Sequence, residues 1–179
     1  TDPDEILTSP DVDIVSICSF DDCHADQVNL ALKYDKHIMV EKPLCLTREE
    51  AKSIYLNLQA SGKRLCSNLI LRGSPRFLKL KEIIDKGDLG EIYYLEGDYI
   101  YGRHWKITEG WRGKLDFYCV IYGGGLHLVD LMLWLTGEEV EEVFSYGNNI
   151  CSRGSQFKYE DCIVSVLRFR NGLVGKTMT

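Results

Sequence analysis

Residues 12–24 read Val-Asp-Ile-Val-Ser-Ile-Cys-Ser-Phe-Asp-Asp-Cys-His, and this stretch decides the fold. The apolar run up to Cys18 is typical of a short buried strand. Asp21 or Asp22 follows as the cap of a helix that extends to about Tyr34. Residues 37–40, His-Ile-Met-Val, predict a second strand, which Pro43 closes. A strand, a helix and a second strand with short connections indicate a parallel sheet.

The same alternation continues on both sides of this stretch. Asp2 and Pro3 predict a helix start ahead of the first strand. Residues 47–50, Thr-Arg-Glu-Glu, form a capping box for a helix that ends at Gly62. Residues 64–71 predict a third strand, and residues 74–87 a helix that begins at Ser-Pro and ends at glycine. We therefore expect a parallel sheet that helices cover on both faces.

The pattern changes after Gly90. Residues 92–101 predict a long aromatic strand, and residues 102–122 a loop rich in Gly, Trp, Arg and Lys. Residues 124–134 predict an apolar helix closed by Gly137, and residues 140–146 and 162–170 predict further strands. Asn171-Gly172 predicts a type I′ hairpin. We expect a fold of α/β plus α+β type: a parallel sheet with helices in residues 1–75, then an α+β domain with an antiparallel sheet in residues 76–179.

Composition excludes several classes of protein. The 179 residues are 45% hydrophobic and 27% charged, which argues against disorder and coiled coil. With 27 acidic and 21 basic residues, the net charge of −6 argues against nucleic-acid and acidic-membrane partners. No apolar run is long enough for a membrane span, and the first residues are acidic, unlike a signal peptide. Seven scattered cysteines without a Cys-x-x-Cys motif predict reduced thiols and no metal site. We expect a cytoplasmic protein.

Three places carry candidate site residues. In an open parallel sheet, ligands bind beyond the carboxyl ends of the strands, and two such ends are residues 19–24 (Ser-Phe-Asp-Asp-Cys-His) and residues 41–43 (Glu-Lys-Pro). Each is also consistent with ordinary solvated residues. In the third place, His127 and Asp130 are three residues apart and share a helix face. Two interpretations stay open there: a capped core helix with one satisfied histidine, or a ligand site that glycines 123–125 open to the backbone.

Together these segments resemble a known family. The order Ser-Phe-Asp-x-x-His, Glu-Lys-Pro, Arg72-x-x-Pro75, Gly-x-x-Gly-Glu-Ile at residues 87–92, Trp111-Arg112 and Gly-Gly-Gly-Leu-His-x-x-Asp at residues 123–130 is similar to the glucose–fructose oxidoreductase and inositol dehydrogenase (Gfo/Idh/MocA) family. The resemblance extends from about residue 11 onward. It implies that residues 1–75 are the second half of a Rossmann-type sheet, in a domain that binds NAD or NADP. It also implies that residues 76–179 belong to a larger domain with an open, mainly antiparallel sheet, which holds a sugar, polyol or sugar derivative. It also implies a homo-oligomer paired through the open sheet.

The resemblance assigns roles to individual residues. It implies that Lys42 contacts the substrate hydroxyl and the nicotinamide, and that His127 assists proton transfer. The residues that it places at the cofactor, besides Lys42, are Ser19, Phe20, Asp21, His24, Glu41 and Pro43. The residues that it places at the substrate are Arg103, Trp111, Arg112 and Asp130. Arg103 and Lys106 would hold an anionic substrate group, or are solvated surface charges.

The sequence departs from the family pattern at several points. Gly123 stands where an aspartate is common, so that Asp130 or a residue elsewhere compensates, or Lys42 and His127 act without it. Asp21 stands where asparagine is usual. No Gly-x-Gly-x-x-Gly motif occurs, which predicts that about 60 residues of a Rossmann domain precede this chain. Its last residues, 174–179, look like a strand of an unfinished sheet. We expect the chain alone to be inactive and to bind dinucleotides poorly.

Three functions compete at this point. The first is an NAD(P)-dependent oxidoreductase that transfers a hydride between the cofactor and a secondary alcohol of a sugar or cyclitol. The second is a catalytically inactive relative that binds sugar or cofactor as a regulatory or interaction protein, which the glycine at position 123 favours. The third is a self-sufficient α/β interaction domain, with Tyr93, Tyr94 and Tyr99 at a dimer face.

Overall fold

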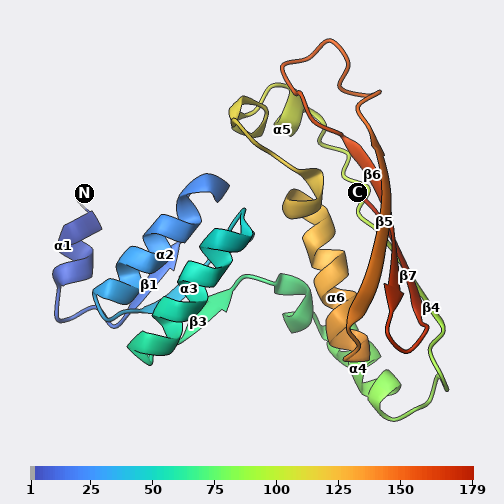
Figure 1. Ribbon diagram of the computed structural model, residues 1–179, viewed down its shortest axis with the longest axis horizontal. Coiled ribbons are helices and arrows are strands. Elements are labelled where there is room, and N and C mark those ends of the chain that lie inside the picture. Colours follow the sequence, from blue (N-terminus) through green and yellow to red (C-terminus); the bar gives the residue numbers. More distant parts are fainter. Residues whose placement is uncertain (1–2) are drawn as a thin grey trace. The chain divides into compact units, whose positions relative to one another are not determined.

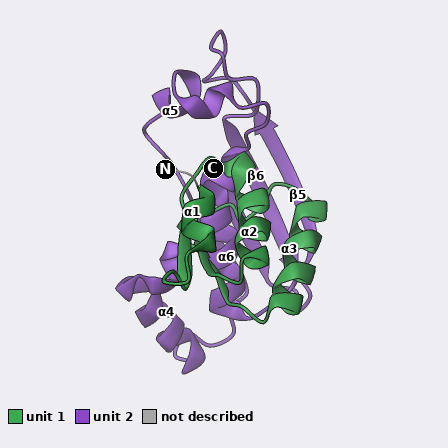
Figure 2. Cartoon of the chain, turned by 90° about the vertical axis from the view of Figure 1, so that its left-hand side faces the viewer, with its two compact units in different colours: residues 1–68 green, residues 69–179 purple. Residues whose placement is uncertain are grey.

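The structure is a computed structural model that describes residues 3–179, so the cap expected at Asp2 lies outside the described residues. The chain divides into two compact units, residues 1–68 and residues 69–179, which have different colours in Figure 2. Each unit has its own sheet and its own core, and each is described by itself.

The first unit alternates helices and strands (Figure 1). Its elements are α1 (Pro3–Thr8), β1 (Ile14–Ile17), the 3-10 turn η1 (Asp21–Cys23), α2 (His24–Lys33), β2 (His37–Val40), α3 (Arg48–Ser61) and β3 (Leu65–Ser67). The three strands are parallel, in the order β1-β2-β3, with Ile17 opposite Val40 and Val40 opposite Ser67. As a consequence, all three carboxyl ends meet at one edge of the sheet.

The core of this unit lies between the sheet and helices α2 and α3. Val28 and Val40 are completely buried, and Ile38, Leu32 and Ile54 pack around them. The α3 helix starts at the expected capping box, where Glu50 N donates to Thr47 Oγ1, and ends at Gly62 in a left-handed conformation (φ 66°). These two signals are local, which explains why the sequence predicts them correctly.

Helix coverage on both faces of the sheet, as expected above, is wrong for this unit. Buried and exposed side chains alternate along β1 and β2, and two of the exposed ones are apolar: Ile14 is 65% exposed and Met39 is 45% exposed. Strand periodicity places alternate residues on opposite faces, and the described helices of this unit pack against only one of them. The helix start also differs: Asp21 and Asp22 lie inside η1, and α2 begins at His24.

The second unit is a mixed sheet with helices (Figure 1). Its elements are η2 (Ile70–Gly73), α4 (Pro75–Asp85), β4 (Tyr94–Asp98), α5 (Trp105–Thr108), η3 (Trp111–Lys114), a π-helical turn η4 (Ile121–Gly125), α6 (Leu126–Thr136), β5 (Val140–Asn148), β6 (Cys162–Phe169) and β7 (Val174–Met178). The strand order is β4-β7-β6-β5, in which β4 and β7 are parallel and the other pairs antiparallel. The predicted strands therefore exist with shifted ends, and the predicted loop 102–122 holds short helical turns.

Two cores stabilise this unit. Helix α6 packs on one face of the sheet, where Met132, Leu167, Phe169 and Leu173 are buried. A second cluster joins the 102–122 loop to the loop before β6; its buried members are Tyr118, Val120 and Phe157. The helix ends at Gly137 with a φ of 72°, as predicted.

The β6–β7 hairpin is confirmed, but its turn type is not I′. Phe169 O accepts from Gly172 N at 2.9 Å, and Gly172 has a φ of 92°. Asn171 does not share the positive φ that a type I′ turn needs at both central residues. Its side chain instead accepts from Leu173 N at 3.0 Å. The turn is thus a four-residue turn over residues 169–172 whose last residue is a glycine with positive φ.

The predicted fold class is confirmed: a parallel sheet of Rossmann type precedes a larger, mainly antiparallel sheet. Within residues 3–179, no helix is long and apolar enough to cross a membrane.

Candidate functional site

His24 joins the ends of the first two strands of the first unit. Its ring is completely buried; Nδ1 lies 2.7 Å from Pro43 O and Nε2 lies 3.2 Å from Ser19 O. A carbonyl oxygen only accepts, so Nδ1–H donates to Pro43 in one tautomer of the ring, Nε2–H donates to Ser19 in the other, and the imidazolium donates to both. Because its side chain has no exposed surface, His24 acts on a ligand only by holding these two loops.

The loop after β2 is fixed by a second contact. Glu41 Oε1 accepts from Asn68 Nδ2 at 2.6 Å, and Asn68 N donates to Val40 O at 2.9 Å. The Lys42–Pro43 peptide is cis, and Lys42 is half-buried. The lysine therefore follows the sheet edge between two anchored neighbours, Glu41 and Pro43.

The loop after β1 brings different groups to the same edge. Ser19 Oγ donates to Gln27 Oε1 at 2.7 Å, which fixes that hydroxyl against α2. Phe20 is 50% exposed, and Asp21 opens η1. An exposed aromatic ring beside an anchored loop offers a flat apolar surface to a ring-shaped ligand.

In the second unit, Asp130 is committed to an ion pair. Both its oxygens accept from Arg72, Oδ2 from Nε at 2.9 Å and Oδ1 from Nη2 at 2.6 Å. This hydrogen-bonded pair raises the pKa of the Arg72 guanidinium further above its ordinary value. The bidentate pair ties α6 to η2, and Asp130 is buried. Its side chain thus holds the helix, and a direct contact with substrate would compete with Arg72.

His127 lies one turn before Asp130 on α6 and is also buried. Its ring lies 6.4 Å from that of Tyr99, which follows β4. The sequence motif therefore places a histidine, a tyrosine ring and an ion-paired carboxylate around the first turns of this helix.

The glycine run before His127 is filled by protein side chains. A Cβ on Gly123 would overlap the Tyr118 hydroxyl, and one on Gly124 would lie 2.5 Å from Tyr99 Cδ1. A Cβ on Gly125 would lie 2.6 Å from Thr179 Oγ1. The interpretation that these glycines leave space for a ligand is wrong, because Tyr118, Tyr99 and Thr179 occupy the space where their side chains would be.

The charged loop of the second unit gathers around two aromatic rings. The Arg103 guanidinium lies 5.8 Å and Lys106 Nζ 5.5 Å from the centre of the Tyr101 ring. The hydrogen bond from Lys106 and the charge of Arg103 lower the pKa of the Tyr101 phenol. The Arg112 guanidinium stacks 4.3 Å above the Trp111 ring. Both pairs leave cations beside exposed or half-buried aromatic surface, which suits an anionic or hydroxyl-rich ligand.

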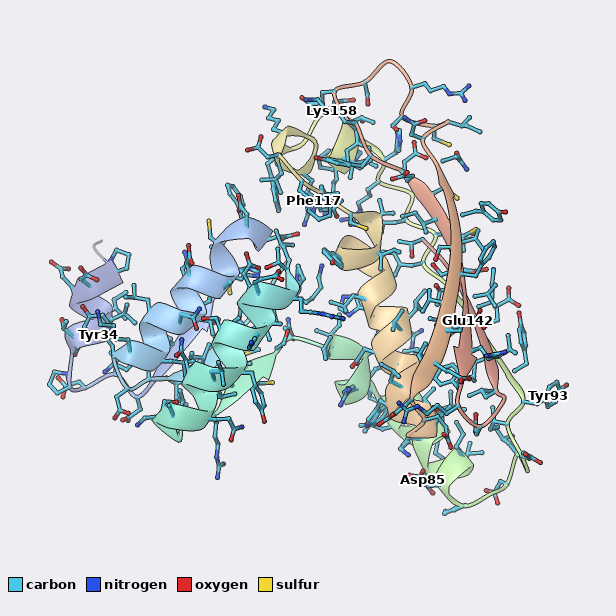
Figure 3. The ribbon with its side chains drawn as sticks, in the orientation of Figure 1. Tyr34, Asp85, Tyr93, Phe117, Glu142 and Lys158 are labelled. Atoms are coloured by element: carbon cyan, nitrogen blue, oxygen red, sulfur yellow. The ribbon has the colours of Figure 1, made fainter. Side chains whose placement is uncertain are left out.

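Sequence reasoning missed three residues that support these groups, Asn68, Tyr101 and Tyr118, and it placed a fourth, Tyr99, at a dimer face. The structure instead has Tyr99 half-buried, with its ring beside His127 and Gly124. The aromatic strand 92–101 is predicted, but its tyrosines become relevant only because the chain returns to them 20 or more residues later at His127. Figure 3 labels Phe117, in the connection that leads to α6. Its ring packs edge-on to Tyr122 and Tyr159 at 6.1 and 5.6 Å.

The first unit fits one end of a nicotinamide dinucleotide. Phe20 supplies an apolar surface for the ring, and Lys42 and Glu41 supply polar groups at the same strand edge. A glycine-rich phosphate-binding turn does not occur in this sequence, so the residues for the pyrophosphate are not in it. Across residues 3–179, no group of three or more His, Cys, Asp or Glu side chains is arranged to hold a metal ion.

Two family models match the chain. Residues 1–69 match the oxidoreductase family with an NAD-binding Rossmann fold, and residues 77–179 match the GFO/IDH/MocA C-terminal domain. The curated myo-inositol 2-dehydrogenase of Thermotoga maritima is 29% identical over 181 residues, which cover 97% of this chain and 51% of that protein. The chain thus spans about half the length of the curated relatives that it matches.

Solved structures agree with the fold. An oxidoreductase domain protein from Kribbella flavida superposes with a TM-score of 0.89 at 25% identity, over 99% of this chain and 51% of that one. A scyllo-inositol dehydrogenase from Lactobacillus casei, solved with bound cofactor NAD(H) and scyllo-inositol, has a TM-score of 0.86 at 19% identity, over 99% of this chain and 53% of that one. The second likeness bears on the fold alone. With both of its units matched by the family's models, the chain belongs to the GFO/IDH/MocA family of oxidoreductases.

Proposed function

We propose that the protein transfers a hydride between NAD or NADP and a secondary alcohol of a sugar, cyclitol or sugar derivative. The observation that carries this proposal is the edge of the first sheet, where His24 holds the Ser19 and Pro43 loops and Lys42 lies between anchored neighbours. The family's NAD-binding Rossmann model over residues 1–69 supports the cofactor. Both NAD and NADP are compatible with these residues.

The chemistry requires a proton acceptor. When an alcohol becomes a ketone, its carbon loses a hydride and its oxygen loses a proton. The bound nicotinamide supplies the hydride chemistry. The chain's own residues must bind the hydroxyl, take up its proton and stabilise the alkoxide that forms.

Lys42 and His127 are the residues that we propose for this task. In this proposal Lys42 binds the substrate hydroxyl next to the nicotinamide, and the imidazole of His127 takes the proton. Ser19, Phe20, Asp21, Glu41 and Pro43 surround the nicotinamide end of the cofactor. His24 positions that edge rather than contacting the cofactor, because its ring is buried between two carbonyl groups.

The two parts of the chain have separate roles in this proposal. Residues 1–75 contribute to the cofactor domain and residues 76–179 form the substrate domain. Arg103, Trp111 and Arg112 contact the substrate, which their cation–aromatic pairs support. Asp130 acts through Arg72 and α6. Without a phosphate-binding turn, the isolated chain is expected to be inactive.

A second candidate function is a catalytically inactive relative that binds sugar or cofactor. It is favoured by Gly123, which supplies no side chain one turn before His127, and by Asp130, whose oxygens both bond to Arg72. Cofactor binding without turnover on any polyol would favour this second function.

We also propose a homo-oligomer paired through the open face of the second sheet, and a location in the cytoplasm. Pairing is supported by Phe144 and Tyr146 on β5, which are 59% and 75% exposed, and by Tyr94 on β4. The location is supported by the seven cysteines, which are all free.

The test is alcohol-dependent reduction of NAD and of NADP by the complete encoded polypeptide, across a panel of cyclitols, aldoses and sugar acids. We expect turnover with at least one polyol, and a loss of at least about 100-fold in kcat for Lys42→Ala and for His127→Ala. Lys52→Ala, an exposed lysine on α3, is the matched control and keeps wild-type turnover. Wild-type turnover in both site variants would overturn the assignment.

A further inference from the structure

Tyr118 places its hydroxyl where a residue-123 side chain would be. A Cβ built on Gly123 overlaps the Tyr118 hydroxyl oxygen and approaches the ring carbon that bears it. The missing side chain of Gly123 thus leaves the space that the Tyr118 hydroxyl occupies. The hydroxyl is the far end of a side chain, so a larger residue at position 123 would displace it.

The Tyr118 ring is anchored, which fixes where its hydroxyl points. The side chain is 7% exposed, and its ring packs edge-on to Phe157 with centroids 6.1 Å apart. Val120 is buried in the same cluster. A ring held on its sides by apolar neighbours presents its polar end in one direction, toward the glycine run.

That direction leads to His127. Residues 123 and 127 are separated by one helical turn, and side chains four residues apart on a helix are neighbours. The Tyr118 hydroxyl fills the side-chain volume of position 123, so it lies on the helix face that carries His127. Other titratable groups near His127 within this unit are Tyr99, whose ring lies 6.4 Å away, and Asp130, which is paired with Arg72.

We propose that Tyr118 is the positioning residue for His127, supplying through its hydroxyl the polar group that Gly123 lacks. The inference rests on the proposed function, in which His127 takes the substrate proton. A hydroxyl both accepts and donates hydrogen bonds, so it orients the imidazole and selects its tautomer without adding a buried negative charge. The Tyr118 hydroxyl thereby takes the place of the carboxylate that position 123 lacks.

The decisive variant is Tyr118→Phe in the complete encoded polypeptide, because it keeps the packed ring and removes only the hydroxyl. The first readout is the NMR titration of the His127 ring, assigned by its disappearance in His127→Gln. Loss of the hydroxyl's hydrogen bond to the ring is expected to shift the midpoint of the His127 titration. The second readout is alcohol-dependent NAD(P) reduction, in which kcat is expected to fall about 10- to 100-fold with KM near the wild-type value.

Tyr159→Phe is the matched control. Tyr159 belongs to the same aromatic cluster, and its hydroxyl donates to the Asp116 carbonyl rather than facing the glycine run. This variant is expected to leave the His127 titration and kcat unchanged. An equal shift in both variants would indicate a general effect of the cluster and would overturn the proposal.

Gly123→Ala tests the same contact from the other side. Its methyl group would push the Tyr118 hydroxyl away, so it is expected to reproduce the Tyr118→Phe shift, and the double variant to show no larger one. An unchanged His127 titration in Tyr118→Phe would overturn the inference, whether or not Gly123→Ala folds. If the His127 titration shifts but no alcohol supports turnover in the wild type, the positioning stands and the proposed function fails. If the wild type turns over and Tyr118→Phe matches it in both readouts, only this inference fails.

Discussion

Arg72 and Asp130, 58 residues apart in the sequence, form a two-point ion pair with N–O distances of 2.9 and 2.6 Å. The pair connects the short turn before α4 to the middle of α6, one turn after His127. A planar guanidinium on a carboxylate fixes orientation as well as distance. The placement of α6, and with it of His127, thus depends on Arg72, which precedes the helix by more than 50 positions.

Removal of Arg72 is expected to destabilise the second unit. In Arg72→Ala the buried Asp130 carboxylate loses both donors, and we expect a loss of about 2 kcal/mol, reduced from the fully buried case because Arg72 is half exposed. All three tryptophans, Trp105, Trp111 and Trp134, lie in this unit, so tryptophan fluorescence during urea unfolding reports on it. Arg170→Ala, which breaks an exposed pair with Glu139, is the control and should cost less than about 0.5 kcal/mol. Equal losses would contradict the role of the pair.

His24→Ala is expected to loosen the sheet edge of the first unit. The change leaves the Pro43 carbonyl without its donor and opens a cavity, at a cost of about 2 to 4 kcal/mol. Hydrogen exchange over residues 12–45, followed by mass spectrometry, should show faster exchange in the loops after β1 and β2. His37→Ala is the control: its half-buried ring accepts from Arg64 N at 3.0 Å at the start of β2, so its loss is expected to affect that end of the sheet and to leave residues 18–24 and 41–45 protected. Unchanged protection of residues 18–24 and 41–45 in His24→Ala would refute the holding role of this ring.

The stability of the second unit is expected to fall in acid through Glu96. A hydrogen bond from Lys176, at 2.8 Å, and one from Tyr94 lower the pKa of this carboxyl. A carboxyl with a lowered folded-state pKa adds stability above its unfolded value, about 4.3, and loses it as the pH falls through the folded-state value.

We therefore expect the urea midpoint, measured by tryptophan fluorescence, to decrease less with decreasing pH in Glu96→Gln than in the wild type. Because the group is exposed, the difference should shrink at high salt. Glu91→Gln, an exposed carboxylate of the same unit, provides the control slope. Parallel curves for the wild type and Glu96→Gln would show that the Lys176 contact adds nothing.

The open sheet face is expected to hold two copies together. Tyr146→Ser removes a large exposed aromatic side chain from that face and is expected to weaken the dimer at least about 10-fold. Sedimentation velocity of the complete encoded polypeptide across a concentration series measures the change. Tyr55, which is 61% exposed on α3 of the first unit and lies outside this sheet, offers Tyr55→Ser as the aromatic control. A monomeric wild type would refute the pairing.

Local signals in the sequence predicted most elements, because each depends on neighbours along the chain. The capping box at Thr47 and the glycines at positions 62 and 137 mark helix ends as expected. The misplaced features depend on more distant partners. The third strand ends at Ser67, because its pairing with β2 ends there, opposite Val40. The sequence predicted an end near Leu71. The turn at Asn171 takes its type from the hydrogen bond between Phe169 and Gly172.

By itself the sequence determined the fold class, the family and the order of the motifs, because periodicity, caps and spacing are properties of short segments. Tertiary structure alone decided what those residues touch. It buried His24 between two carbonyl groups, committed both oxygens of Asp130 to Arg72, and filled the glycine run with Tyr118, Tyr99 and Thr179. The physical reason is that these contacts, which join residues from 5 to 58 positions apart, depend on how loops and elements pack, and no local pattern encodes that packing.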